Sequence, residues 1–172
     1  ISNELKRHLN LDTLFQSIVS AVSRSLGFDV VLLSLYDSER DVFVRRAQRG
    51  LDRRWEEIQG EEVPASEITK YWTDRNVVSK SYLVRDRTQK ELGRYDIVVP
   101  PPSRRRGADG WRPYEILWIP LHSEEKLVGC FSVDNPRNGQ APSLETIQAL
   151  EIFANQAVAA IDLRQSRRWP AQ

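Results

Sequence analysis

The residue types best suited to nucleophilic chemistry in this sequence are one cysteine, Cys130, and a histidine eight positions before it, His122. A turn that pairs His122 with Leu127 places Cys130 opposite Ile119, so three residues of strand, about 10 Å, separate His122 from that position. A cysteine–histidine pair must come within hydrogen-bond reach, about 3 Å, before the base can activate the thiol. We therefore expect a buried structural thiol and a histidine close to the turn, not a catalytic pair.

Metal and phosphate chemistry have no better support in the sequence. The single cysteine and the two histidines, His8 and His122, are one ligand short of a four-ligand zinc site and are widely spaced. The eight glycines are scattered and form neither a P-loop nor a dinucleotide-binding motif. No GxSxG nucleophile motif occurs either. We expect no metal site, no catalytic residues and no enzymatic activity in this chain.

Aromatic and small polar side chains give a stronger signal, because aromatic walls with a few polar groups are typical of a small-molecule pocket. In the predicted pairing Trp118 lies across from Phe131, with Cys130 and Ile119 on the other face of the same hairpin. A core filled by its own aromatic rings fits the same residues, so both interpretations stay open. The candidate ligand-binding residues are Tyr71, Trp72, Ser79, Ser81, Tyr82, Trp111, Trp118, Phe131 and Asp134.

Composition and charge bound the class of protein. The chain has 172 residues, of which 40% are hydrophobic and 28% charged, and a formal net charge of +1. Residues 85–112 carry +4 and the remainder −3. A near-neutral whole argues against a nucleic-acid partner. The run Arg104–Arg106 fits a solvated loop tip better than an anion site.

The cellular setting is predicted from what the sequence lacks. The longest apolar run, Val30–Leu35, is far shorter than the roughly 18 residues that a membrane helix needs, so we expect no membrane contact. The polar start, without a secretory leader, predicts a cytoplasmic domain. The chain begins at Ile1 and has no methionine, so we interpret it as a piece of a longer protein.

Hydrophobic periodicity predicts an α+β fold in which an antiparallel sheet carries helices on its faces. Adjacent strands joined by tight turns indicate the antiparallel pairing. Asp37–Asp41 and Ser123–Lys126 supply the polar turns, and residues 85–114 form a long loop. The expected elements are a helix over 11–26, strands over 30–36 and 42–48, a short helix over 66–75, strands over 77–84, 116–121 and 127–134, and a helix over 143–165.

The last predicted helix has apolar residues on nearly two faces, whereas a surface helix needs only one. We expect its first stripe to hold the sheet and its second strip to pack against another copy of the chain, giving a homodimer through the terminal helices. The first stripe is Leu144, Ile147, Leu150, Ala154, Val158 and Ile161, and the second is Phe153, Ala157 and Ala160.

Three segments of the sequence are informative together: LDTLFQSIVSAVSRSLGFDVVLLSLYD, LWIPLHSEEKLVGCFSVDNP and, most specifically, SLETIQALEIFANQAVAAIDLRQ. They resemble a GAF domain of bacterial signalling proteins of the sensor histidine kinase or diguanylate cyclase type. The resemblance implies a GAF/PAS-like sheet of five or six strands in the order 2-1-5-4-3. It also implies terminal helices on one face, with a ligand pocket on the other beneath the short helix and the long loop. We divide the chain into a linker helix over 1–10, the GAF domain over 11–165 and a tail over 166–172.

The resemblance predicts a module but not its ligand. The NKxFxDE motif of the cyclic-nucleotide subgroup is absent, and one cysteine is too few for the free methionine sulfoxide reductases. Cys130 lies on a predicted strand, whereas bilin-binding relatives carry their chromophore cysteine in the pocket loops, and His122 is poorly placed to bind haem. We expect a non-catalytic sensory module of a two-component or similar system. It would bind an unidentified small molecule under residues 85–114 and relay the change through its terminal helices. The alternative is a dimerising spacer that binds nothing.

Overall fold

A single antiparallel sheet organises the computed structural model, which describes residues 2–99 and 107–168. Seven strands lie in the order β3-β2-β1-β7-β6-β5-β4, and the predicted order 2-1-5-4-3 corresponds to its five central strands. The predicted α+β class is confirmed, with a strand count slightly above the expected five to six. The strands are β1 (Phe28–Asp37), β2 (Val42–Arg49), β3 (Glu62–Pro64), β4 (Val77–Val78), β5 (Ser81–Val84), β6 (Ile116–Ser123) and β7 (Lys126–Pro136).

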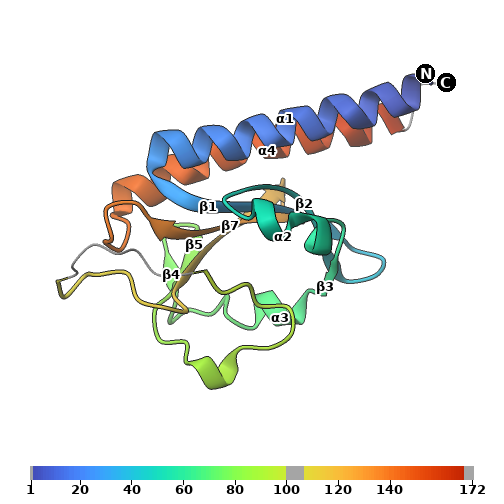
Figure 1. Ribbon diagram of the computed structural model, residues 1–172. Coiled ribbons are helices and arrows are strands. Elements are labelled where there is room, and N and C mark those ends of the chain that lie inside the picture. The colour runs from blue at the N-terminus through green and yellow to red at the C-terminus, as the bar shows by residue number, and fades with distance from the viewer. Residues whose placement is uncertain (1, 100–106, 169–172) are drawn as a thin grey trace.

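Two long helices cover one face of the sheet, and shorter elements lie around its edge and over the other face (Figure 1). The long helices lie side by side, and α1 begins at the end of the layer where α4 finishes. Helix α1 runs unbroken across residue 10, so the predicted boundary between linker and domain stays a prediction. The helices are α1 (Asn3–Leu26), α2 (Asp52–Ile58), α3 (Ser66–Thr69) and α4 (Leu144–Arg168), with one 3-10 turn, η1 (Gln89–Glu91).

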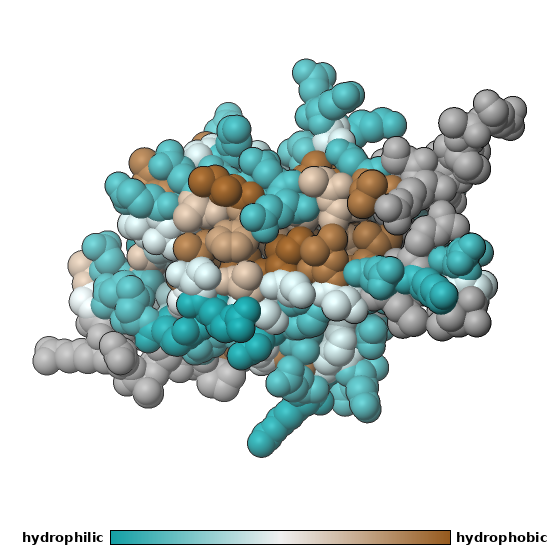
Figure 2. Space-filling view, turned by 90° about the horizontal axis from the view of Figure 1, so that it is seen from above, coloured by the Kyte–Doolittle hydropathy of each residue, from teal (hydrophilic) through white to brown (hydrophobic). Residues whose placement is uncertain are grey.

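The helix layer has an apolar band on its outward side. Figure 2 looks down on this side and shows apolar residues along the helices, bordered by polar ones. Ile152 is 64% exposed, and Leu14, Leu144 and Leu163 are also exposed. Leu144 is therefore not a core residue as its spacing suggested. None of the described helices is both long and apolar enough to cross a membrane.

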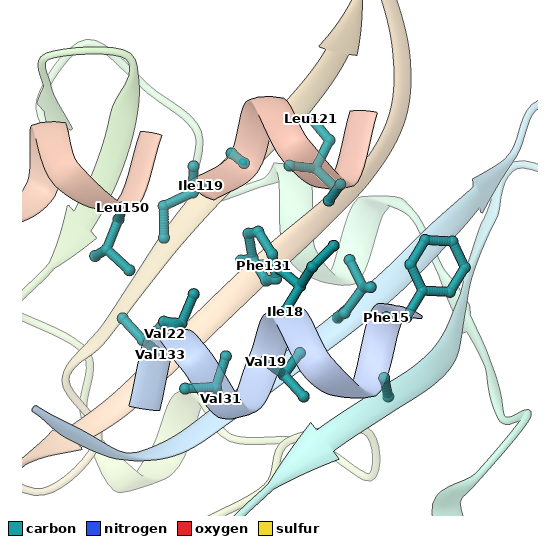
Figure 3. Close-up of a cluster of buried hydrophobic side chains, with 14 of the residues drawn as sticks. Phe15, Ile18, Val19, Val22, Val31, Ile119, Leu121, Phe131, Val133 and Leu150 are labelled. Carbon is teal, nitrogen blue, oxygen red and sulfur yellow. The ribbon is translucent and has the colours of Figure 1, made fainter. Parts of the chain in front are cut away.

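The main core lies between the helix layer and the sheet (Figure 3). The spacing of Phe15, Ile18, Val19 and Val22 puts all four on the inner side of α1, where each is at most 5% exposed. The strip predicted for a partner chain also lies here: Ala157 and Ala160 are buried in this core, and Phe153 packs against it. The residues predicted to contact a second copy were therefore wrong. Helix α4 packs against both the sheet and α1, so two of its faces are buried within this chain.

Short elements account for the other differences from prediction. The segment over 77–84, predicted as one strand, is a hairpin of β4 and β5 whose turn places Ser79 at a φ of 58°. Helix α3 has four residues instead of ten. Helix α2 and strand β3 were not predicted, and β3 pairs with β2, so β2 is not an edge strand.

The pairing of β6 with β7 shifts by one residue between Leu121 and His122. His122 pairs with Leu127 as predicted, but beyond the shift Ile119 pairs with Phe131 and Trp118 with Ser132. The predicted pairs Trp118–Phe131 and Ile119–Cys130 were therefore wrong. Because side chains alternate between faces, the shift sends Phe131 into the helix-covered core and turns Cys130 to the face that carries Trp118.

The close approach of β7 to β1 depends on Gly129. A methyl group there would lie 2.5 Å from the backbone oxygen of Ser34 and 3.3 Å from a methyl of Leu121. Gly129→Ala is expected to lower the free energy of unfolding by about 1–3 kcal/mol, because two central strands must move apart. Urea denaturation measures this loss. Gly93→Ala is the control, since its new methyl would have only one neighbour, at 3.9 Å; equal effects of the two substitutions would contradict the account.

Candidate functional site

A cavity of about 60 Å³ lies on the face of the sheet that α1 and α4 leave uncovered. Its floor carries Leu32 of β1 and Ser132 of β7, and its roof carries Tyr95, Ile97 and Val99 from the segment that follows η1. One water position needs about 10–15 Å³ of such space, so the cavity has room for about four to six water-sized groups. A cavity thus lies between the sheet and the described part of the long loop, and whether it holds a small molecule stays a prediction.

An aromatic cluster borders this cavity. Trp118 stacks on Tyr71 with ring centres 5.4 Å apart, and Trp72 stacks on Tyr82 at 5.6 Å. Phe43 meets Trp72 edge to face at 5.9 Å. The structure therefore brings these four candidate residues together, but only Trp118 lines the cavity. Tyr71 contacts the cavity lining through Trp118, whereas Trp72 and Tyr82 stack on each other.

Arg87 holds the roof over this aromatic cluster. Its guanidinium lies over the rings of Tyr71 and Trp118, 5.4 and 5.7 Å from their centres. Its Nε donates to the backbone oxygen of Tyr114 at 2.9 Å, and its Nη1 to Asp96 Oδ1 at 3.0 Å. Arg87, near the start of the long loop, is thereby tied to the end of the loop at Tyr114 and to its middle at Asp96. The sequence showed only that this loop is basic, so the role of Arg87 was not predicted.

Arg45 was also missed, because β2 contains a second irregularity. Ser34 pairs with Arg45 and Leu33 with Ala47, so Arg46 is an extra residue in the strand. Phe43 and Ala47, which would share a face in a regular strand, consequently lie on opposite faces. Arg45 lines the cavity. Consecutive arginines in a strand that is covered on both faces are the signal that could have revealed a buried guanidinium.

The contacts of Arg45 hold it beside the roof. Its Nη2 donates to the backbone oxygen of Tyr95 at 2.6 Å, and its Nε lies 3.0 Å from Glu61 Oε1. Burial lowers the pKa of Arg45, and the nearby Glu61 carboxylate opposes that shift. The cavity therefore contains a cation that its own surroundings solvate poorly.

Asp134 and Trp111 meet at another part of the site. Trp111 Nε1 donates to Asp134 Oδ1 at 2.7 Å, and the backbone N–H of Asn135 donates to the same oxygen at 2.7 Å. Burial raises the pKa of Asp134 to about 6, against the opposing effect of these two donors. Asp134 lines the cavity, and Trp111 lines a smaller hollow that shares Asp134 and Arg87 with it.

Three candidate residues lie away from the cavity. Ser79 Oγ and Ser81 Oγ each donate to the Glu151 carboxylate of α4 at 2.7 Å, so both hydroxyls are turned toward the helix layer. Phe131 is completely buried in the core beneath α1 and α4. The two serines were wrongly predicted to line the pocket because residues 77–84 form a hairpin and not one strand. Phe131 was wrongly predicted to line it because the register shift in the β6–β7 pairing was not foreseen.

Cys130 is a poor nucleophile although it lines the cavity. Burial raises the pKa of its thiol to about 12, so the side chain stays protonated at neutral pH. His122 is exposed. Across residues 2–99 and 107–168, no group of three or more His, Cys, Asp and Glu side chains could hold a metal ion. The arginines at 104–106 lie outside the described residues.

Comparison with known proteins gives a family and a set of similar folds. The model of the GAF domain family matches residues 10–161. No curated protein matches the chain. Similar solved structures include residues 122 to 287 of a methyl-accepting chemotaxis protein, which is 20% identical to this chain, with a TM-score of 0.66. That match covers 94% of this chain and 93% of the other.

Two further solved structures have comparable coverage. The GAF domain/HD domain protein from Geobacter sulfurreducens is 10% identical, with a TM-score of 0.64 over 90% of this chain and 94% of that one. The second GAF domain of DevS from Mycobacterium smegmatis is 16% identical, with a TM-score of 0.60 over 92% and 97%. At these low sequence identities, the similarity shows a shared fold and nothing about function.

The environment of Asp134 predicts that the difference in folding stability between the wild type and a variant without this carboxyl group depends on pH. Its folded-state pKa of about 6 lies above the ordinary value of 3.8, so the folded protein holds this proton more tightly than the unfolded chain. The stabilisation from this group is therefore greatest below pH 4 and is lost as the pH rises through 6. Asp134→Asn removes the titration and keeps an oxygen that can accept from Trp111.

We expect the stability of Asp134→Asn relative to wild type to rise by about 1–2 kcal/mol between pH 4.5 and pH 7. Urea denaturation at several pH values measures this difference, in which the titration of all other groups cancels. The same comparison with Asp74→Asn, at an exposed carboxylate, is the control. A constant difference across the pH range would show that the Asp134 carboxyl titrates normally.

Proposed function

The chain belongs to the GAF domain family, and on that basis we propose that it is a sensory module that binds a small molecule in the cavity above β1 and β7. The signal would pass to the terminal helices without a chemical step. Our proposal includes a cytoplasmic location and an output domain of the histidine kinase or diguanylate cyclase type. A chemotaxis protein among the similar structures supports the signalling context.

The observation that carries this proposal is a cavity with mixed lining between the sheet and the long loop. Apolar side chains such as Leu32 and Ile116 alternate there with polar ones such as Ser34 and Ser132. This combination suits a ligand that needs both burial and orientation. The thiol of Cys130, the nearest nucleophile, is protonated, which favours binding over catalysis.

Contacts between the sheet and α4 support the relay. The Glu151 carboxylate accepts from Ser79, Ser81 and the backbone N–H of Lys80, each at 2.7 Å, and so fixes the β4–β5 turn to α4. Tyr82, at the start of that hairpin's second strand, stacks on Trp72 of the aromatic cluster. A ligand that displaces the aromatic cluster would bias the position of α4, provided that it prefers one arrangement.

Filling the cavity tests the proposed binding site. Ser132→Leu adds an apolar group between Leu32 and Trp118, whereas Ser132→Ala leaves the space open. Ligand-observed NMR with a panel of alcohols, amides and carboxylic acids of up to six non-hydrogen atoms is expected to detect binding to wild type and Ser132→Ala. Ser132→Leu is expected to weaken that binding about tenfold or more, because its side chain occupies the ligand's place.

The fold of both variants is checked by circular dichroism and thermal unfolding. Equal binding to a folded Ser132→Leu variant would place the ligand elsewhere on the protein. The absence of binding to wild type by every panel member would contradict the sensory proposal and favour a module that binds nothing.

The apolar band of Figure 2 favours a second candidate function, dimerisation through the terminal helices. Ile152 and Leu163 of α4 and Leu14 of α1 are the exposed apolar side chains that would meet a second copy. They replace the buried strip predicted from the sequence. A dimer could serve the relay or act as a spacer without a ligand.

A charge in this band tests the dimer. Ile152→Glu would bury an unpaired carboxylate in the interface, so sedimentation is expected to change from dimer in the wild type to monomer in the variant. Gln89→Glu adds the same charge at an exposed position of η1, away from the helix layer, and is the control. A wild type that remains monomeric at millimolar concentration would exclude the dimer.

A further inference from the structure

Arg45 is the least satisfied charged group in the cavity. Its side chain is 6% exposed, so nearly all its hydration is lost on folding. A guanidinium has five N–H donors, and burying them without acceptors is unfavourable. The N–H groups of Arg45 that lack an acceptor among the described residues therefore indicate which ligand group the cavity could bind.

The hydrogen bonds of Arg45 leave it incompletely paired. Nη2 donates to Tyr95, whereas Nε has no hydrogen-bond partner within the described part of the chain. Glu61 Oε1 lies only 3.0 Å from that Nε, but the N–H is not directed at it. Glu61 is itself 28% exposed, which screens its charge. The ion pair therefore offsets part of the charge of Arg45 but leaves its Nε–H without a well-directed acceptor in the described structure.

The other carboxylates of the cavity are engaged elsewhere. Glu67 pairs with Lys70 at 3.3 Å, and Asp96 accepts from Arg87. Asp134 lies at the other end of the floor, because it pairs with Val30 whereas Arg45 pairs with Ser34, four residues along β1. The groups nearest to Arg45 across the sheet, Ser34 and Cys130, are uncharged. Within the described residues, none of these three lining carboxylates forms an ion pair with Arg45.

Most of the remaining lining is apolar, including Leu51, Val63 and Ile68. A phosphate or sulfate ion exposes oxygen atoms in every direction, and these walls could not satisfy them. A carboxylate has two acceptors at one end, which match the fork of a guanidinium, and an aliphatic body at the other. The 60 Å³ of space limits that body to a few carbon atoms.

We propose that the cavity binds a short-chain carboxylic acid of about four to six non-hydrogen atoms, whose carboxylate accepts hydrogen bonds from Arg45 and whose aliphatic part lies against Leu51, Val63 and Ile68. The inference rests on the proposed sensory function and adds the chemical class of the ligand. Burial of Arg45 near a poorly directed Glu61 gives the anion a specific role, since it supplies the missing acceptor.

Isobutyrate and isobutyramide test the inference, because they have the same shape and differ in charge. Calorimetric or NMR titration of the wild-type protein is expected to give a Kd for isobutyrate about tenfold or more below that for isobutyramide, with phosphate weaker still. Arg45→Gln is expected to remove this preference, whereas Arg45→Lys retains a charge but not the fork and keeps part of it.

Arg46→Gln is the matched control. It removes the same charge one residue along β2, where Arg46 instead contacts Asp12 of α1 at 2.7 Å, and it should leave the preference unchanged. Should Arg45→Gln fail to fold, the wild-type comparison of acid and amide still decides the question. Equal or tighter binding of isobutyramide, or a preference for phosphate, would overturn the carboxylate inference and leave the sensory function standing. Failure of the whole fragment panel to bind would overturn both.

Discussion

The one-residue shift in the pairing of β6 with β7 decides what each face of the sheet contains. Because side chains alternate along a strand, the shift between Leu121 and His122 assigns Phe131 to the helix-covered core and Ser132 to the cavity. The extra residue Arg46 in β2 has the same effect, since it lets Arg45 and Ala47 reach opposite faces. Two local irregularities thus separate a closed apolar core from an open polar site in one continuous sheet.

The helix-covered face and the cavity face of the sheet differ in the charged groups that they bury. Between the sheet and the terminal helices lies a large cluster of buried hydrophobic residues, which is stabilised by burial of apolar surface. The cavity side instead buries Arg45 and Arg87 and raises the pKa of Asp134. Buried charges cost stability unless they are fully paired. The proposed binding rests on their concentration beside the cavity, and Glu151 links the β4–β5 hairpin to α4.

Long periodic segments were predictable from the sequence, and local irregularities were not. The stripe from Phe15 to Val22 and the apolar run of β1 each fit one type of element, so α1 and β1 lie where expected. No pattern distinguishes a regular hairpin from one with a register shift, which is why Phe131 and Cys130 were exchanged between faces. The two apolar strips of α4 were recognised, but whether α1 or another chain covers the second depends on tertiary packing. Arg45 was missed because the extra residue Arg46, which lets Arg45 reach the cavity face, leaves no periodic signal in β2.

The central claim is that the face of the sheet carrying Trp118 and Ser132 holds a small molecule. The most direct measurement is a crystal structure of the protein grown with a saturating concentration of the fragment that binds most tightly in solution. The account predicts one ordered molecule between Ser132 and the roof residues Tyr95 and Ile97. A cavity that holds only water while the fragment occupies another surface would contradict it.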